Sequence, residues 1–574
     1  MTSARLRQYL RGPFPDDLVA AVIVVILLVP QSMAYALLAG LPPSAGVLAS
    51  LAPVVVYAML GSSSSLAVGP VAVLAMMTAQ AIAPVAGSHG VSAELAAVVL
   101  ATEVAALLTV AVLLRLEVLA ALLSAPVLHG FIAGAAIVIA LGQVPALLGL
   151  PIRGNTLVEL AQAAWSATSL TPHAITAAVG LLALGTLWLL RRHAARLLRA
   201  LGLGARTAAL LGRAAPILVI VAAIAWVVFS PGLAGGVPLA GSVSLAAAWP
   251  PPLPWSAPAT VWIALLPAAA LIALVGYVES LAVAESLGLR RGEKVSPRRE
   301  LAGLAGANLA AGVSGGFPVT GGFARSIVNF DAGARTRMAG VLTAFGLLLA
   351  IAVAGHWLER LPKAVLAATI IIAVLSLVEA HPFRQAWRWS RAEWALMVMV
   401  AGLTIVLGVE PALAVGVLAS VALLLKRKAR PHWAEVGRVP GSDSFRNVRR
   451  FGEVETLPGV LTLRIDESLV FVNSRWLAET VVAQVRAREG VHDVVLMMSG
   501  VNDIDLSGLE ALEQLSDSLH TLGARLHLSE VKGPLRDRFE AFGLGWLNGR
   551  TFTTQSEAHL ALTSRPADTE KAGS

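Results

Sequence analysis

Apolar runs long enough to cross a bilayer follow one another from Leu18 to Leu425. A transmembrane helix needs about 20 predominantly apolar residues, so this stretch accommodates roughly twelve to fourteen helices. Loops rich in Gly, Pro or Arg separate the runs, and the charges fit best with fourteen. One large soluble globule is excluded, because only 14% of the whole chain is charged, whereas a soluble domain is about a quarter charged.

Charge divides the chain into two parts. Residues 1–425 carry 24 Lys or Arg and 15 Asp or Glu, whereas the much shorter stretch 426–574 carries 19 and 20. We therefore predict an α-helical polytopic membrane protein that ends in a soluble domain. The predicted boundaries are a cytosolic N-terminus at 1–15, a transmembrane domain at 16–426 with repeats at about 16–230 and 259–426, a linker at 427–450, the soluble domain at 451–563 and a disordered tail at 564–574.

Basic residues predict the topology, because Lys and Arg are enriched in cytosolic loops. Six arginines lie between residues 191 and 213 with no acid among them, after the sixth predicted span. An even number of spans places both chain ends in the cytosol, in a multi-pass protein of the inner or plasma membrane. The net charge of +8 is the sum of +9 in 1–425 and −1 in 426–574. Topology accounts for this excess, so we expect the lipid bilayer and no nucleic acid as a partner.

Two predicted spans are interrupted at matching places, the third span of each half. The interruptions are Gly61–Pro70 and Gly315–Ser326, both rich in Gly and Ser or Pro. Seven spans per half is an odd number, so similar halves would form inverted repeats, which place a binding site where broken helices meet. A half-helix after each break directs its free N–H groups at that point, which favours an anion. The alternative is that small residues only permit close helix contacts.

Two charged residues inside predicted spans are candidates for function, because charge is costly in a membrane. Arg325 directly follows the second break, and its planar guanidinium suits an oxyanion. The alternative is a structural arginine paired with Asp331 or a carbonyl. Glu279, in the eighth span, can carry a proton or serve as a fixed counter-charge to Arg325. Both roles are compatible if protonation of Glu279 frees Arg325 for the substrate.

Enzymatic chemistry has no candidate constellation in this sequence. The chain contains no cysteine, and no Asp, Glu and His residues have the spacing of metal ligands. We expect a protein that is not an enzyme and has no cofactor, with a proton as the coupling ion.

Several long motifs resemble the SulP sulfate permeases. Pro30–Pro43 resembles their first span and Val68–Leu74 their third. The pair Glu279-Ser280, the stretch Glu300–Asn308 and the stretch Phe323–Thr336 resemble their spans eight to ten. The likeness covers nearly the whole chain.

The resemblance implies fourteen transmembrane helices in two inverted seven-helix repeats, arranged as a core and a gate domain. It also implies an anion site between the third and tenth helices, with Glu279 in proton coupling and the backbone N–H groups of Phe323 and Ala324 around the oxyanion. The expected substrate-binding residues are Gln31, Tyr35, Ala67, Val68, Phe323, Ala324, Arg325 and Ser326.

The function implied is secondary transport of a small inorganic anion, with proton-coupled sulfate uptake favoured. A bicarbonate or C4-dicarboxylate transporter, or an anion exchanger, of the same family is the alternative. Sodium-coupled bicarbonate members carry an Asp nine positions after the span-eight Glu, where this chain has Gly288, and this difference favours protons. From other classes, a nucleobase permease is disfavoured by Arg325, and a membrane sensor that transports nothing stays open.

The soluble part alternates strand and helix patterns, which predicts a small α/β domain. We expect strands at Val460–Ile465, Val494–Met498 and Ala524–Ser529, and helices at Trp476–Arg488, Ser507–Leu522 and Arg536–Gly543. The turn Val501–Leu509 resembles the conserved loop of STAS domains. Where related antagonists carry a phosphorylated Ser this chain has Leu506, so a homodimer or regulatory contact is favoured over phosphorylation. Ser507 is expected to cap the next helix.

Overall fold

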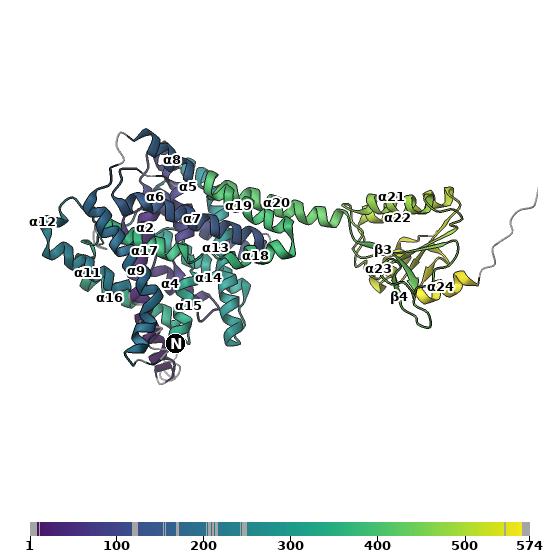
Figure 1. Ribbon diagram of the computed structural model, residues 1–574, viewed down its shortest axis with the longest axis horizontal. Coiled ribbons are helices and arrows are strands. Elements are labelled where there is room, and N and C mark those ends of the chain that lie inside the picture. The colour runs from purple at the N-terminus through teal and green to yellow at the C-terminus, as the bar shows by residue number, and fades with distance from the viewer. Residues whose placement is uncertain are drawn as a thin grey trace, which may run out of the picture. The chain divides into compact units, whose positions relative to one another are not determined.

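The computed structural model describes two compact units, residues 1–420 and 421–574 (Figure 1). The described residues are 9–564 without 11, 118–123, 153, 155, 168–170, 203, 205–207, 209–211, 213–215, 242, 244–248 and 545–546. Predictions for most of the N-terminus 1–15, part of the Arg-rich stretch 191–213 and the tail from 565 lie outside this set.

Helices make up nearly all of the first unit. Its first half contains α2 (Phe14–Leu38), α3 (Pro43–Leu48), α4 (Ala52–Leu60), β1 (Val68–Gly69), α5 (Ala72–His89), α6 (Ala93–Leu113), α7 (Ala125–Leu148), α8 (Leu157–Ser166), α9 (Ala174–Ala200), α11 (Pro216–Phe229) and α12 (Pro231–Ala234). Its second half contains α13 (Ala259–Arg291), α14 (Pro297–Ser314), β2 (Thr320–Gly321), α15 (Phe323–Ala332), α16 (Met338–Leu358), α17 (Lys363–Leu375), α18 (Ala380–Trp389), α19 (Arg391–Leu407) and the part of α20 (Val409–Ala429) up to residue 420.

Among the described residues, eight helical segments are long and apolar enough to cross a membrane. They are α2, α3 with α4, α6, α7, α9, α13, α16 and α17 with α18. Adding α5, α11, α14, α15, α19 and α20, which are shorter, broken or less apolar, gives the fourteen spans that the sequence predicts. The helical membrane architecture is as expected.

The same order of elements occurs in both halves around the two interruptions. In each half a long helix (α2 or α13) is followed by a second span, a two-residue strand and a half-helix (α5 or α15). The strands β1 and β2 pair antiparallel with each other. Antiparallel pairing of equivalent strands is what two inverted repeats produce.

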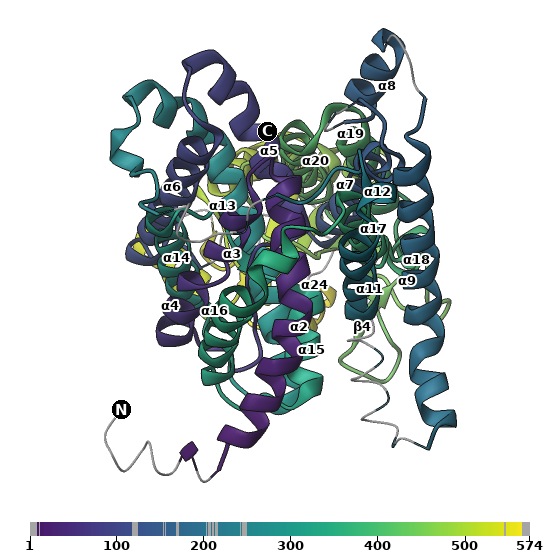
Figure 2. The same ribbon diagram turned by 90° about the vertical axis from the view of Figure 1, so that its left-hand side faces the viewer.

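α2 packs against both α15 and α16 (Figure 2).

The second unit is a six-stranded sheet covered by helices, with strand order β4-β3-β5-β6-β7-β8. Strands β5 to β8 are parallel, and β3 joins β5 antiparallel. The strands are β3 (Trp433–Arg438), β4 (Phe445–Asn447), β5 (Val460–Ile465), β6 (Asp493–Met497), β7 (Arg525–Ser529) and β8 (Thr551–Phe552), and the helices are α21 (Ser474–Arg486), α22 (Leu506–Thr521), α23 (Gly533–Phe542) and α24 (Gln555–Thr563).

The sequence pattern gives three of these strands and three of these helices, with small shifts at their ends. Strands β3 and β4 lie within 427–450, the stretch expected to be a linker. Ser507 was expected to be the N-cap of α22, and this is wrong. The Asp505 carboxylate caps the helix by accepting from the Gly508 N–H at 2.8 Å, two residues earlier. Asp505 has extended backbone dihedrals and the helix begins at Leu506, so Ser507 already lies within the first turn.

Candidate anion-binding site

The two interruptions of the membrane unit meet at one place. Val68 pairs with Gly321 and Gly69 with Thr320. On the edge of this pair, the Gly322 N–H donates to the Ala67 carbonyl at 3.2 Å. These bonds satisfy backbone groups that would otherwise lie unpaired within a membrane, where each costs several kcal/mol.

Helices α5 and α15 begin directly after these strands. α5 begins at Ala72 after Val71, and α15 begins at Phe323 after Gly322. Neither N-terminus receives a side-chain cap. The first N–H groups of a helix have no partner within the helix and carry partial positive charge. Both half-helices therefore begin with backbone donors available beside the strand pair.

Arg325 lies in the first turn of α15 with its side chain buried, at 4% exposure. Its two terminal nitrogens, Nη1 and Nη2, have no hydrogen-bond partner in the described structure. The guanidinium lies against the backbone of both breaks. A Cβ added at Gly69 would come within 2.9 Å of Nη1, and one added at Gly322 within 3.3 Å of Nη2. Arg325 is therefore not paired through these nitrogens with Asp331 or a carbonyl, the structural alternative considered for it above.

Ser326 joins the two breaks from the other side. Its hydroxyl donates to the Gly322 carbonyl at 2.7 Å and accepts from the Ala67 N–H at 2.9 Å. The hydroxyl therefore holds the chain before β1 against the start of α15. Ala67, Val68, Phe323, Ala324, Arg325 and Ser326, all expected from the sequence, lie together here.

Helix α13 forms one wall of the site. Its Ser280 hydroxyl accepts from the Gly321 N–H at 2.7 Å and lies 2.6 Å from the Thr320 hydroxyl. Thr320 in turn donates to the Gly276 carbonyl at 2.6 Å. Glu279 is the neighbour of Ser280 and interacts electrostatically with Arg325. Ser280 and Thr320 were not among the predicted site residues, although Ser280 belongs to the motif pair Glu279-Ser280 and Thr320 to the second interruption, Gly315–Ser326.

Helix α2 also contributes to the site, because it contacts both α5 and α15. Tyr35 is buried at 9% exposure and interacts electrostatically with Arg325 and Glu279. Gln31 lies one helical turn earlier on α2 and is half-buried. The nine predicted site residues therefore come from α2, α13, α15, and the end of the first break at Ala67 and Val68.

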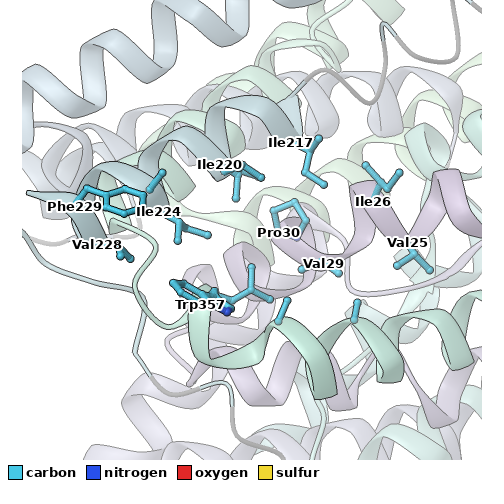
Figure 3. A pocket seen from close by; sticks show the side chains of 15 residues that line it. Val25, Ile26, Val29, Pro30, Ile217, Ile220, Ile224, Val228, Phe229 and Trp357 are labelled. Carbon is cyan, nitrogen blue, oxygen red and sulfur yellow. The ribbon is translucent and has the colours of Figure 1, made fainter.

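A separate crevice of about 500 Å³ lies between α2, α11 and α16 (Figure 3). Its lining is aliphatic and aromatic, including Val29, Pro30, Ile220, Ile224 and Trp357. No charged residue lines this crevice and Trp357 is the one lining side chain with a hydrogen-bond donor, so this crevice is not the candidate site. No group of three or more His, Cys, Asp or Glu residues among those described could hold a metal ion.

The family model described as "Sulfate permease family" matches residues 14–400 of this chain. The chain belongs to the sulfate permease family. A second model, that of the STAS domain, matches residues 452–558. The resemblance seen in the sequence motifs is thereby confirmed for both parts.

Relatives of this sulfate permease family member are named as sulfate transporters. A probable sulfate transporter of Mycobacterium tuberculosis (strain CDC 1551 / Oshkosh) is 34% identical over 551 residues, covering 94% of this chain and 93% of the relative. The chloroplastic sulfate transporter 4.1 of Arabidopsis thaliana is 32% identical over 534 residues, covering 90% of this chain and 75% of the relative. The prediction of a transporter and not an enzyme is confirmed.

Solved structures of anion transporters share the fold. The murine solute carrier 26 family member A9 anion transporter superimposes with a TM-score of 0.85 at 21% identity, covering 96% of this chain and 92% of that one. The transmembrane domain of the cyanobacterial bicarbonate transporter BicA superimposes with a TM-score of 0.60 at 18% identity, covering 71% of this chain and 98% of that one. At these identities the likeness extends to the fold alone, and it confirms the predicted fold class.

Proposed function

We propose that this sulfate permease family member takes up sulfate together with protons by alternating access. The anion binds between the N-termini of α5 and α15, in contact with Arg325. Gln31 and Tyr35 contribute from α2, and Glu279 carries the coupled proton. The backbone N–H groups of Phe323 and Ala324 are the donors closest to Arg325 in sequence.

The buried guanidinium of Arg325 is the observation that supports this proposal most directly. A buried polar group without a partner costs about 1–3 kcal/mol, and a charged one costs more. An oxyanion would supply the missing acceptors to Nη1 and Nη2 and a compensating charge. The two uncapped helix starts add further donors, as anion sites at helix N-termini do.

Coupling follows from the electrostatic interaction between Arg325 and Glu279. When Glu279 is ionised, its negative charge opposes an anion and partly neutralises Arg325. When Glu279 takes up a proton, the full charge of Arg325 becomes available to the substrate. Anion and proton then bind together. The site that holds both carries less net negative charge than the site with the anion alone, which lowers the free-energy cost of moving it through the membrane.

Sulfate is the proposed substrate because the relatives described above are named as sulfate transporters. Bicarbonate or C4-dicarboxylate transport, and anion exchange, are the alternatives within the family. The deciding experiment measures uptake of radiolabelled sulfate into proteoliposomes with and without an imposed inward proton gradient. Saturable uptake that the gradient accelerates is expected, with competition by other anions giving the preference. If labelled sulfate, bicarbonate and dicarboxylate all fail to enter under any gradient, the proposal is wrong.

The proposal also covers topology and assembly. We place both chain ends in the cytosol of a cell with the protein in its inner or plasma membrane, and the STAS domain in a homodimer. Deletion of residues 430–574 separates a transporter from a membrane sensor, since uptake by the shortened chain would establish transport as the function of the membrane part.

A further inference from the structure

Helix α14 packs with its backbone close to α4. A Cβ added at Gly303 would come within 2.8 Å of the Tyr57 ring, and one at Gly306 within 2.6 Å of Leu60. Gly residues spaced in this way let two helices approach closely in a membrane. α14 is therefore fixed against the helix that leads into the first break, and its own C-terminal end leads into the second.

Glu300, in the first turn of α14, holds the chain before β1. Its side chain is completely buried. One carboxylate oxygen accepts from the Tyr57 hydroxyl at 2.6 Å. The other accepts from the Ser62 N–H at 2.8 Å, the Ser62 hydroxyl at 2.6 Å and the Ser63 N–H at 3.0 Å. Three of these four bonds come from Ser62 and Ser63, so the Glu300 carboxylate fixes the chain at these two residues.

The restraint passes along the chain into the candidate site. The Ser63 hydroxyl accepts from the Ser65 N–H at 3.3 Å and from the Leu66 N–H at 3.2 Å. The next residue is Ala67, whose N–H donates to Ser326 at the start of α15. Glu300 is thus connected to the anion site through the backbone of 62–67 and not by contact with the anion.

Asn308, on the same helix, holds the chain before β2 in an equivalent way. It is 1% exposed. Its Oδ1 accepts from the Val319 N–H at 2.9 Å, and its Nδ2 donates to the Val319 carbonyl at 2.9 Å. Val319 directly precedes Thr320, the first residue of β2. Eight residues separate Asn308 from Glu300, which is about 12 Å along a helix.

We propose that Glu300 and Asn308 are positioning residues for the anion site. By holding the segments before β1 and β2 from one rigid helix, they set how these strands pair and so where α5 and α15 begin beside Arg325. This inference rests on the proposed function for its effect on sulfate. A purely structural role would instead change the amount of folded protein and leave sulfate affinity alone.

The first test measures sulfate uptake by the full-length protein in proteoliposomes, with rates normalised to folded, monodisperse protein. Glu300→Ala and Asn308→Ala are expected to raise the KM for sulfate about tenfold, equivalent to losing one strong buried hydrogen bond, with little change in kcat. Glu300→Gln, whose carbonyl can still accept from Ser62 and Ser63, should restore much of the affinity. Glu285→Gln, which replaces an exposed carboxyl on α13 by an amide, is the matched control and should leave the KM unchanged.

Milder variants keep the test decisive if an alanine variant does not fold. Tyr57→Phe removes one of the four donors to Glu300, and Ser62→Ala removes another while keeping the backbone bond. Each is expected to raise the KM for sulfate by a few-fold. A KM within twofold of wild type for every folded variant would overturn the proposal.

A second readout does not depend on the substrate. The chain has no cysteine, so spin labels at Gly87→Cys on α5 and Arg335→Cys just after α15 are the only labels. In the Glu300 and Asn308 variants, the measured distance between the labels should shift or broaden. An unchanged distance would show that α14 does not position these helices. Absence of sulfate uptake by the wild type would contradict the proposed function, whereas the label distance would still decide this inference.

Discussion

At the scale of single residues, Arg325 differs from its neighbour Ser326 in how its polar atoms are bonded. Its neighbours are the backbone at Gly69 and Gly322, and its terminal nitrogens have no acceptor. Ser326, its neighbour in sequence, is fully satisfied by the Ala67 N–H and the Gly322 carbonyl. Ser326 holds the two breaks together, whereas Arg325 keeps donors that the proposed anion would use.

Replacement of Arg325 by Ala should weaken sulfate affinity about ten- to a hundredfold, because one or two charge-assisted hydrogen bonds are lost. The concentration dependence of labelled sulfate uptake measures this. Arg335→Ala is the matched control, since Arg335 forms an exposed pair with Asp16, which contributes little. Undiminished affinity in Arg325→Ala would make this arginine structural.

Replacement of Glu279 by Gln should remove the effect of a proton gradient on sulfate uptake and leave sulfate binding largely intact. The amide keeps the shape of the protonated acid but cannot release a proton. Uptake measured at a series of imposed pH steps gives the dependence, and Glu285→Gln should keep it. If Glu279→Gln responds to the gradient as the wild type does, another group carries the proton.

Among the elements, the short strand β1 leaves no room for a side chain at Gly69, where it meets Arg325. Gly69 has φ +153°, a conformation that side chains rarely adopt, and any Cβ there would meet the Arg325 guanidinium. Backbone and guanidinium can approach only because this position lacks a side chain. The strand therefore brings the backbone of the first half to the charge of the second.

Gly69→Ala is expected to displace the guanidinium and to weaken sulfate affinity several-fold or more. Gly87→Ala, on α5 itself, is the control, because a Cβ at Gly87 meets nothing within 4 Å and the change should stabilise the helix slightly. The increase in thermal unfolding temperature produced by sulfate measures both. An equal increase in the two variants would contradict the close approach described above.

At the scale of the whole molecule, the STAS unit has its own core and its own buried charge. Asp493, 2% exposed, accepts from His527 at 2.7 Å, from His492 at 3.0 Å and from Arg525 at 3.2 Å. Burial by itself raises the pKa of Asp493, but the hydrogen bonds from the two histidines and the charge of Arg525 outweigh it and lower the pKa to about 2.

A carboxyl whose pKa is lower in the folded state stabilises the fold above its unfolded pKa of about 3.9 and loses that effect as pH falls toward 2. We expect Asp493→Asn in a 430–574 fragment to lower the free energy of unfolding at pH 7 by about 2–3 kcal/mol. Its loss of stability between pH 4 and pH 2 should be shallower than that of the wild type. Urea unfolding at several pH values measures this, and the exposed Asp517→Asn should behave as wild type.

The sequence determined the features that depend on local composition. The length of apolar runs predicts helical spans, and Gly, Ser and Pro in matching places predict the two breaks, because neither inference needs a partner from elsewhere in the chain. The same holds for Arg325 and Glu279, since a charge within an apolar run is visible without a structure.

Tertiary structure decided which groups satisfy one another. The pairing of Val68 with Gly321, the bonds of Glu300 to Ser62 and the bond of Ser280 to Gly321 join residues that are 41 to 253 positions apart. Within a membrane no water competes for these donors and acceptors, so the packing of the helices alone selects each partner. A local pattern marks a polar residue as important, but the fold determines what it holds.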